Sequence, residues 1–323
     1  MKEVKNVGII GQGFVGTAVM KKFSQSFNIF AYDKDPNKSI IIGMDKPPTS
    51  INIATLVENC SIIFICVNTP MFEDGQCDTS IVESVLEDIA KEAEFQNKKV
   101  VTIIKSTVPP GTTERLNGLS NMVGVTFSPE FLTEANATAD FDNQTRIVLG
   151  IDYFEYIEPI RSMFANVFPN ANLILINSKE AEMTKYATNL FLATKVSFFN
   201  DIYSLCEKLS IDYNDVIEAT MHDPRIGKSH YDVPGHDGDR GFGGHCFPKD
   251  INAILHIAQT LNLGLPTITG AQVTNMIVRQ NKDWESMEGR AVSKRPDIDT
   301  ETRDKYPANV EGSLEFNTNT ITD

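Results

Sequence analysis

The sequence lacks the cysteine patterns that mark disulfide frameworks and metal sites. Its five cysteines, at positions 60, 66, 77, 206 and 246, form no CxxC pair and show no metal-ligand spacing with the five histidines. Their odd number also argues against a disulfide framework, because disulfides join cysteines in pairs. We therefore expect a protein of a reducing compartment that holds no metal ion.

Long hydrophobic runs and an excess of positive charge are missing as well. The longest apolar run, residues 62–67, is too short to span a bilayer, and residues 1–10 show no cleavable signal pattern. The net charge of −14 disfavours a nucleic-acid surface, because binding to a phosphate backbone needs a basic face. The sequence thus predicts a cytoplasmic protein with neither a membrane nor a nucleic acid as partner.

The N-terminal part of the sequence predicts a strand, a glycine-rich turn and a helix. The apolar run at 4–10 leads into the turn GQGFVG at 11–16. In a dinucleotide-binding turn, the first glycine allows the tight bend, the second lets the backbone approach a pyrophosphate, and the third lets helix and strand pack closely. Asp33 follows Gly11 by 22 residues, where an acidic side chain binds a ribose 2′-hydroxyl and repels a 2′-phosphate. The pattern predicts NAD rather than NADP.

Apolar runs and helical segments alternate through the first 177 residues. Strands are expected at 28–32, 61–67, 99–105, 122–127, 146–150 and 172–176. This alternation predicts an α/β fold, a Rossmann-like doubly wound parallel sheet with helices on both faces. Three polar stretches, at 68–70, 106–112 and 128–134, follow predicted strands and should meet at the sheet edge where ligands bind. Taken singly, each is also compatible with an ordinary turn.

A long helix and an all-α domain are expected after the sheet. Residues 179–209 contain neither Gly nor Pro and carry apolar residues at helical spacing, with Ser178 as predicted N-cap. Lys185 and Asn189 share a face of this helix, and for such a pair a solvated surface is the usual alternative to a site. Shorter helices are predicted at 212–222, 249–262 and 267–284.

The chain divides into three predicted parts. These are an NAD-binding domain at 1–177, a helical central domain at 178–284, and a polar tail at 285–323. The tail carries 9 acidic and 5 basic side chains and shows no sustained periodicity, so we expect it to be flexible.

The most informative stretch is GFGGHCFPKD at 241–250. Three glycines precede Cys246, and Pro248 stands near the start of a predicted helix, so Cys246 lies near a helix N-terminus. That position favours the nucleophilic thiolate, whereas the flanking aromatic residues oppose it by desolvation. An inert buried thiol is the alternative. The preceding loop, 223–244, carries cationic and hydrogen-bonding side chains that suit a phosphorylated or polyhydroxyl ligand.

Together the motifs resemble those of the UDP-glucose/GDP-mannose dehydrogenase family of nucleotide-sugar dehydrogenases, which includes the UDP-glucose 6-dehydrogenases. The resemblance covers about residues 4–284 and is carried by GQGFVG at 11–16, KSTVPPGTT at 105–113, SPEFLTEANATADF at 128–141, EAEMTKYATNLFLATKVSFFND at 180–201, DPRIG at 223–227 and GFGGHCFPKD at 241–250. It implies a four-electron oxidation of a sugar C6 alcohol, such as UDP-glucose to UDP-glucuronate, with NAD as oxidant. It also implies a homodimer built on the helix at 179–209.

The resemblance implies a role for each matched catalytic residue. Cys246 matches the nucleophile that adds to a bound aldehyde and forms a thioester. Lys185 matches a lysine that stabilises the oxyanion, helped by Asn189, and Asp250 matches a carboxylate that transfers protons with a water. Glu130 and Thr107 match residues around thioester hydrolysis and its water chain.

The resemblance also implies two sets of binding residues. Cofactor contacts fall at Gly11, Gly13, Phe14, Val15, Gly16, Asp33, Lys38, Thr69, Thr107 and Glu134. Substrate contacts fall at Glu130, Phe131, Leu132, Lys185, Asn189, Arg225, Tyr231, Phe242 and Gly243. Within this set, Arg225 matches an arginine that reaches the substrate of the neighbouring subunit.

One departure from the family's pattern keeps two alternative functions open. The family carries a third domain, a second doubly wound unit that binds the nucleotide, and the 323 residues leave no room for it. A two-electron hydroxy-acid dehydrogenase would explain the departure but leaves Cys246 without a role. A catalytically inactive NAD-binding subunit that dimerises through the long helix is the other alternative.

Overall fold

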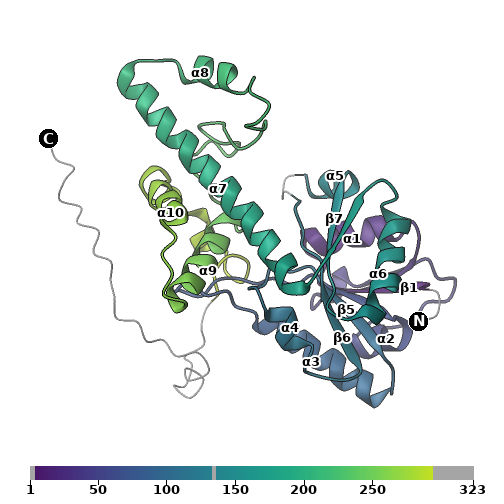
Figure 1. Ribbon diagram of the computed structural model, residues 1–323. Coiled ribbons are helices and arrows are strands. Elements are labelled where there is room, and N and C mark those ends of the chain that lie inside the picture. The colour runs from purple at the N-terminus through teal and green to yellow at the C-terminus, as the bar shows by residue number, and fades with distance from the viewer. Residues whose placement is uncertain (1–3, 133–135, 294–323) are drawn as a thin grey trace.

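The computed structural model describes residues 4–132 and 136–293, and an eight-stranded sheet forms its first part (Figure 1). All neighbouring strands are parallel except the first pair and the pair in sixth and seventh place. The prediction of an α/β, Rossmann-like fold is confirmed. In spatial order the strands are β3 (Ile40–Ile42), β2 (Asn28–Tyr32), β1 (Asn6–Ile10), β4 (Ile62–Ile65), β5 (Val100–Ile104), β6 (Val123–Phe127), β7 (Arg146–Gly150) and β8 (Asn172–Ile176).

The central strands are buried on both faces. The β4 sequence IIFI and the β5 sequence VVTII are buried at every position, as expected where helices cover a parallel sheet on both sides. One face packs Phe64 against Phe23 and Phe164, with ring centroids of Phe23 at 4.9 and 5.6 Å from theirs. The helices of this part are α1 (Phe14–Phe23), α2 (Ile53–Asn59), α3 (Ser80–Phe95), α4 (Thr112–Leu116), α5 (Ala137–Asp142) and α6 (Phe154–Val167).

The three glycines of the turn after β1 have different surroundings. Gly11 has a left-handed φ of 91°, and a Cβ there would lie 2.6 Å from the carbonyl oxygen of Cys66 at the end of β4. A Cβ on Gly16 would lie 1.8 Å from the carbonyl oxygen of Gly11. A Cβ on Gly13, the N-cap of α1, would meet nothing within 4 Å. Gly11 and Gly16 are therefore required by packing, whereas Gly13 leaves open space at a helix N-terminus.

This difference predicts opposite effects for two Gly→Ala variants. Gly16→Ala forces the turn away from the helix, and overpacking of about 1–3 kcal/mol should lower the Tm by several degrees. Gly13→Ala should leave the Tm unchanged but weaken NAD binding by about tenfold, because its methyl group fills the space that a pyrophosphate approaches. Calorimetry and NAD titration of both variants test the pair. Equal Tm losses would contradict the assignment.

The second part of the molecule is organised along α7 (Ser178–Leu209), which extends away from the sheet (Figure 1). Its N-cap is Asn177 rather than the predicted Ser178, because the Asn177 side chain accepts from the backbone of Glu180 while the Glu180 side chain accepts from the backbone of Asn177. The short helix α8 (Tyr213–Thr220) lies near its far end. Helices α9 (Phe247–Thr260) and α10 (Pro266–Val278) pack against α7.

The helix predicted at 267–284 ends earlier, at Val278. The next residue, Arg279, leaves the helical conformation and directs its buried guanidinium into a cluster of carboxylates. Its Nη1 lies 2.7 Å from Asp237 and its Nη2 lies 2.9 Å from Asp283. These ion pairs fix the loop before Cys246 against the end of α10, and they explain why the helix stops.

Residues 285–293, the first part of the predicted polar tail, form hydrogen bonds with the loop after β4. Met71 N–H donates to the carbonyl of Ala291 at 2.8 Å, and Ser293 N–H donates to the carbonyl of Met71 at 2.7 Å. The hydroxyl of Ser293 donates to Asp78 at 2.6 Å. This segment is therefore tied to the loop after β4 by backbone and side-chain hydrogen bonds. The rest of the predicted tail lies outside the described residues. Among the described helices, none has the length and hydropathy needed to cross a bilayer.

Candidate active site

Three loops meet at the carboxyl ends of β4, β5 and β6. The hydroxyl of Thr69 donates to the carbonyl of Thr107 at 2.7 Å, which joins the first loop to the second. Lys105 Nζ donates to the carbonyl of Pro129 at 3.0 Å and lies 3.5 Å from Glu130 Oε2, which joins the second to the third. The polar stretches at 68–70, 106–112 and 128–134 therefore share one edge of the sheet in their described residues.

Glu130 is a buried carboxylate that faces this edge. Its Oε1 accepts hydrogen bonds from the backbone N–H groups of Phe131 at 2.6 Å and Leu132 at 2.8 Å. Its Oε2 receives no hydrogen bond from the described residues, although Lys105 lies nearby. Burial lowers the pKa of Lys105, and the charge of Glu130 opposes that effect. Oε2 is thus free to accept a hydrogen bond from a water or a ligand.

Helices α7 and α9 bring three predicted catalytic residues, Lys185, Asn189 and Asp250, into one region. Asn189 Nδ2 donates to Asp250 Oδ2 at 2.6 Å, while Lys249 Nζ donates to Asp250 Oδ1 at 2.5 Å. Lys185, one turn before Asn189, is also buried, and its Nζ lies 5.5 Å from the centroid of the Phe131 ring. The pair on α7 is therefore not a solvated surface pair, and it connects α9 to the loop after β6.

Cys246 is the N-cap residue of α9 and is half-buried. Burial raises the pKa of its thiol, but a hydrogen bond with the His245 side chain and the positive charges of His245 and Lys185 outweigh burial. The pKa of Cys246 is consequently below its ordinary value, although Asp250 acts in the opposite direction. The thiolate is the nucleophilic form of cysteine, so these neighbours favour reactivity at neutral pH. The Cys77 thiol differs from that of Cys246, because burial raises the pKa of Cys77 to about 11.

The cofactor side lies at the carboxyl end of β1 and β2. Asp33 Oδ2 accepts a hydrogen bond from Gln12 N–H in the glycine turn at 2.7 Å, and Oδ1 accepts one from Asp35 N–H at 2.9 Å. Phe14, half-exposed at the start of α1, has the guanidinium carbon of Arg290 5.2 Å from its ring centroid. Open space at Gly13, a helix N-terminus and a strand-end carboxylate together fit a dinucleotide such as NAD.

The remaining predicted cofactor residues have varied positions. Val15 lies in the first turn of α1 and is partly buried, and Lys38 lies exposed in the short 3₁₀ turn at 36–38. Thr107 is partly buried between Thr69 and the turn that leads to α4. Glu134 lies outside the described residues.

Two predicted substrate residues stand apart from the cluster around Cys246. Arg225 has an 87% exposed side chain, and its Nε donates to Asp223 at 2.9 Å. Tyr231 packs beside Phe199, with ring centroids 6.4 Å apart, and its carbonyl accepts from the Tyr213 hydroxyl at 2.5 Å. Within one chain, the described contacts of Tyr231 thus lie with α7 and α8, and those of Arg225 lie with Asp223 in the loop after α8.

The other two substrate candidates, Phe242 and Gly243, belong to the loop that leads directly to Cys246. The Phe242 ring centroid lies 6.0 Å from that of Phe247. A Cβ on Gly243 would lie 2.2 Å from an Nη atom of Arg279, so glycine is needed for the ion-pair cluster to form.

Sequence reasoning missed three charged residues at the site. Lys105, Lys249 and Arg290 contact Glu130, Asp250 and Phe14, respectively. Lys105 opens the motif KSTVPPGTT, and Lys249 stands beside Asp250 in GFGGHCFPKD, so both had a signal in motifs already singled out. Arg290 had none, because it lies in the segment predicted as a tail.

The chain matches the profiles of two domains of one enzyme family. The NAD binding domain of the UDP-glucose/GDP-mannose dehydrogenase family matches residues 45–168, and the central domain of that family matches residues 179–276. The YtcA protein of Bacillus subtilis is 30% identical over 329 residues, which cover 90% of this chain and 74% of the relative. The chain belongs to the UDP-glucose/GDP-mannose dehydrogenase family. The family's NAD binding domain confirms the predicted cofactor, NAD.

Further members of the family and related structures agree with this assignment. The UDP-glucose 6-dehydrogenase of Pseudomonas aeruginosa is 35% identical over 219 residues, which cover 64% of this chain but only 47% of the relative. A UDP-glucose dehydrogenase structure from the hyperthermophilic archaeon Pyrobaculum islandicum superposes with a TM-score of 0.72 at 27% identity, covering 85% of this chain and 68% of its own. The GDP-mannose dehydrogenase of Pseudomonas aeruginosa shares the fold, with a TM-score of 0.61 at 24% identity, over 84% of this chain and 68% of its own.

Proposed function

We propose that this protein oxidises the C6 alcohol of a nucleotide sugar to a carboxylate, with two NAD molecules reduced in sequence. The observation that carries the proposal is the position of Cys246 at the N-terminus of α9, where the charges of both Lys185 and Asp250 act on a thiol of lowered pKa. A simple alcohol dehydrogenase needs no thiol nucleophile. An alcohol-to-acid oxidation does, because a free aldehyde is a poor hydride donor and its thiol adduct is a good one.

The side chains divide the chemistry among them. NAD, when bound, accepts a hydride at each of the two oxidations, and the proton that the C6 hydroxyl loses at the first passes to solvent through the water at Asp250. Between them, the Cys246 thiolate attacks the aldehyde carbon, a C–S bond forms, and the carbonyl electron pair moves to oxygen. Lys185 and Asn189 offset the negative charge on that oxygen. Loss of the second hydride leaves a thioester on Cys246.

Hydrolysis of the thioester regenerates the thiolate. Water adds to the thioester carbon, the C–S bond breaks, and the carboxylate product leaves. Asp250, with a water, accepts the proton that the attacking water loses. Glu130 Oε2 has no hydrogen bond from the described residues and is suited to orient that water. Lys249 donates a hydrogen bond to Asp250 and so holds its carboxylate in place.

UDP-glucose is the proposed substrate. The Pseudomonas aeruginosa and Pyrobaculum islandicum proteins named above support it, since both carry the name of UDP-glucose dehydrogenases. GDP-mannose is the competing nucleotide sugar, because the family name includes it.

The stoichiometry of NADH formation tests the proposal. Purified protein with excess NAD and limiting UDP-glucose should form two NADH per sugar, read by absorbance. One NADH per sugar would favour the two-electron hydroxy-acid dehydrogenase. Normal NAD binding without NADH from UDP-glucose, GDP-mannose or UDP-N-acetyl sugars would favour the inactive NAD-binding subunit.

A homodimer through α7 is part of the proposal. Phe191, Phe198 and Leu205 recur every seven residues along this helix, and their side chains are 66%, 56% and 54% exposed. Met276 and Ile277 of the neighbouring α10 are also exposed. A second copy would bury this stripe, and it would give the exposed Arg225 a site to reach. A monomer in sedimentation velocity at micromolar concentration would overturn this part.

A further inference from the structure

Glu182 is a fully buried carboxylate on α7 to which the proposed reaction gives no role. Its Oε1 accepts hydrogen bonds from Thr113 N–H at 2.8 Å and from Thr113 Oγ1 at 2.6 Å. Its Oε2 accepts one from Gly111 N–H at 2.5 Å. All three donors are neutral groups of the turn that leads from Thr107 into α4. A carboxylate in this setting is tolerated only because its hydrogen bonds are made, so its position and that of the turn are coupled.

The same turn is fixed from its other side to the sheet. The carbonyl of Thr107 accepts the hydrogen bond from Thr69 at the end of β4. Glu182 precedes Lys185 by three residues and Asn189 by seven, so the three side chains lie along one face of α7. The turn carrying Thr107 is therefore held between the edge that binds the cofactor and the helix that carries the oxyanion-stabilising lysine.

We infer that Glu182 is a positioning residue, which holds the Thr107 turn at a fixed place relative to Lys185 and so aligns the NAD side of the site with the substrate side. The inference rests on the proposed function. Gly111 supports it, since its left-handed φ of 96° is a conformation that favours glycine, and in that conformation its N–H donates to Glu182. A glutamine at 182 could accept at only one atom, and its NH₂ group would oppose one of the N–H donors.

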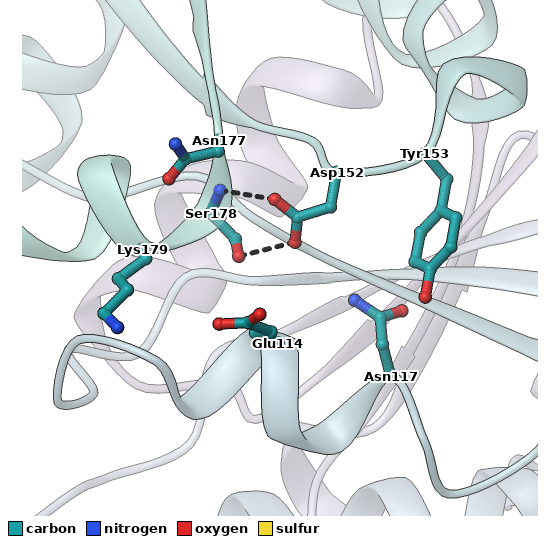
Figure 2. Close-up of a pocket in the computed structure, with 7 residues that line it drawn as sticks. All are labelled: Glu114, Asn117, Asp152, Tyr153, Asn177, Ser178 and Lys179. Atoms are coloured by element: carbon teal, nitrogen blue, oxygen red, sulfur yellow. Dashed lines mark hydrogen bonds between the residues drawn. The ribbon is translucent and has the colours of Figure 1, made fainter.

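A polar cavity of about 590 Å³ lies at the first turn of α7, beside residues of α4 (Figure 2). Ser178 donates to Asp152 across its upper rim, with N–H and hydroxyl bonds of 2.8 and 2.6 Å. Glu182 is not among its lining residues and is fully buried. The lining residues are Glu114, Asn117, Asp152, Tyr153, Asn177, Ser178 and Lys179.

The test is NAD binding by the full chain with Glu182→Gln. We expect the NAD dissociation constant to rise about tenfold, while the rate of Cys246 alkylation by iodoacetamide stays as in the wild type, because α9 is not disturbed. Amide exchange in the peptide that contains Gly111 and Thr113 should become faster. Unchanged NAD affinity would overturn the inference even if the Tm falls, since a merely structural role predicts that outcome.

Thr126→Val is the matched control. Thr126 is a buried threonine in β6 whose hydroxyl donates to the carbonyl of Thr102 at 2.8 Å, away from the junction. An equal loss of NAD affinity in this control would also overturn the inference. If Glu182→Gln does not fold, Thr113→Val removes one of the three bonds, and a rise of about threefold is expected. Failure of the proposed function looks different: the wild type would bind NAD but form no NADH, and the effect of Glu182→Gln on NAD affinity would still be measurable.

Discussion

Cys246→Ala is expected to lower the rate of carboxylate formation from UDP-glucose, and with it that of the second NADH, by about 10⁶-fold, the size of loss seen when a catalytic nucleophile is removed. Without the thiolate there is no adduct from which the second hydride can leave, so at most one NADH per sugar should form. The Cys246 side chain makes no capping hydrogen bond to α9 and is only half-buried. The variant should therefore fold and bind NAD as the wild type does, which NAD titration checks.

Cys206→Ala is the control for this variant. Cys206 lies in a separate hydrophobic cluster with Tyr213 and Ile217, near the far end of α7. It should keep both the rate and the ratio of two NADH per sugar. A Cys246→Ala protein that still forms two NADH per sugar would exclude the thioester route and require a different second oxidation.

Lys185→Met is expected to lower kcat by about 10²–10³-fold, the usual cost of removing one oxyanion-stabilising group. Methionine keeps the length and packing of the side chain but removes the charge. That charge also lowers the pKa of Cys246, so its loss should raise the thiol pKa. Alkylation by iodoacetamide requires the thiolate, and its midpoint on the pH axis should therefore move to higher pH in the variant.

The same helix provides a control for the charge. Lys179 lies two turns before Lys185 and lines the polar cavity at the start of α7 instead of the region around Cys246 (Figure 2). Lys179→Met removes an equal charge and should change neither kcat nor the alkylation midpoint. If Lys185→Met leaves both quantities unchanged, the lysine does not face the reacting oxygen.

The fold was largely predictable where apolar runs were strong. The predicted strands at 28–32, 146–150 and 172–176 have the bounds of β2, β7 and β8. The three-residue strand β3 was missed, because so short an element carries no periodic signal. Helix α6 contains Pro159, which disrupts a helical pattern in sequence although the helix accommodates it. The attachment of residues 285–293 to the loop after β4 was not predictable, because it depends on backbone hydrogen bonds, which leave no pattern in the side chains.

The candidate site was predictable in its parts but not in its assembly. The four-residue spacing of Lys185 and Asn189 places both on one face of a helix, yet spacing alone does not say whether that face meets solvent. That face is buried, because Asn189 donates a hydrogen bond to Asp250, which lies 61 residues later in the chain and belongs to α9. Glu182 had no signal for its role, because its partners lie 69 to 71 residues earlier in the chain.

A bend at the base of α7 displaces residues by an amount that grows with their distance along the helix. At 1.5 Å per residue, Lys185 lies about 10 Å from the N-terminus of the helix and its other end about 48 Å away. A bend of about 5° at the junction with the sheet would move Lys185 by about 1 Å but the far end by about 4 Å. The groups that we propose to act on the reacting carbon thus lie near the base of the helix, where bending displaces them least. Whatever the far end contacts must tolerate several times that displacement.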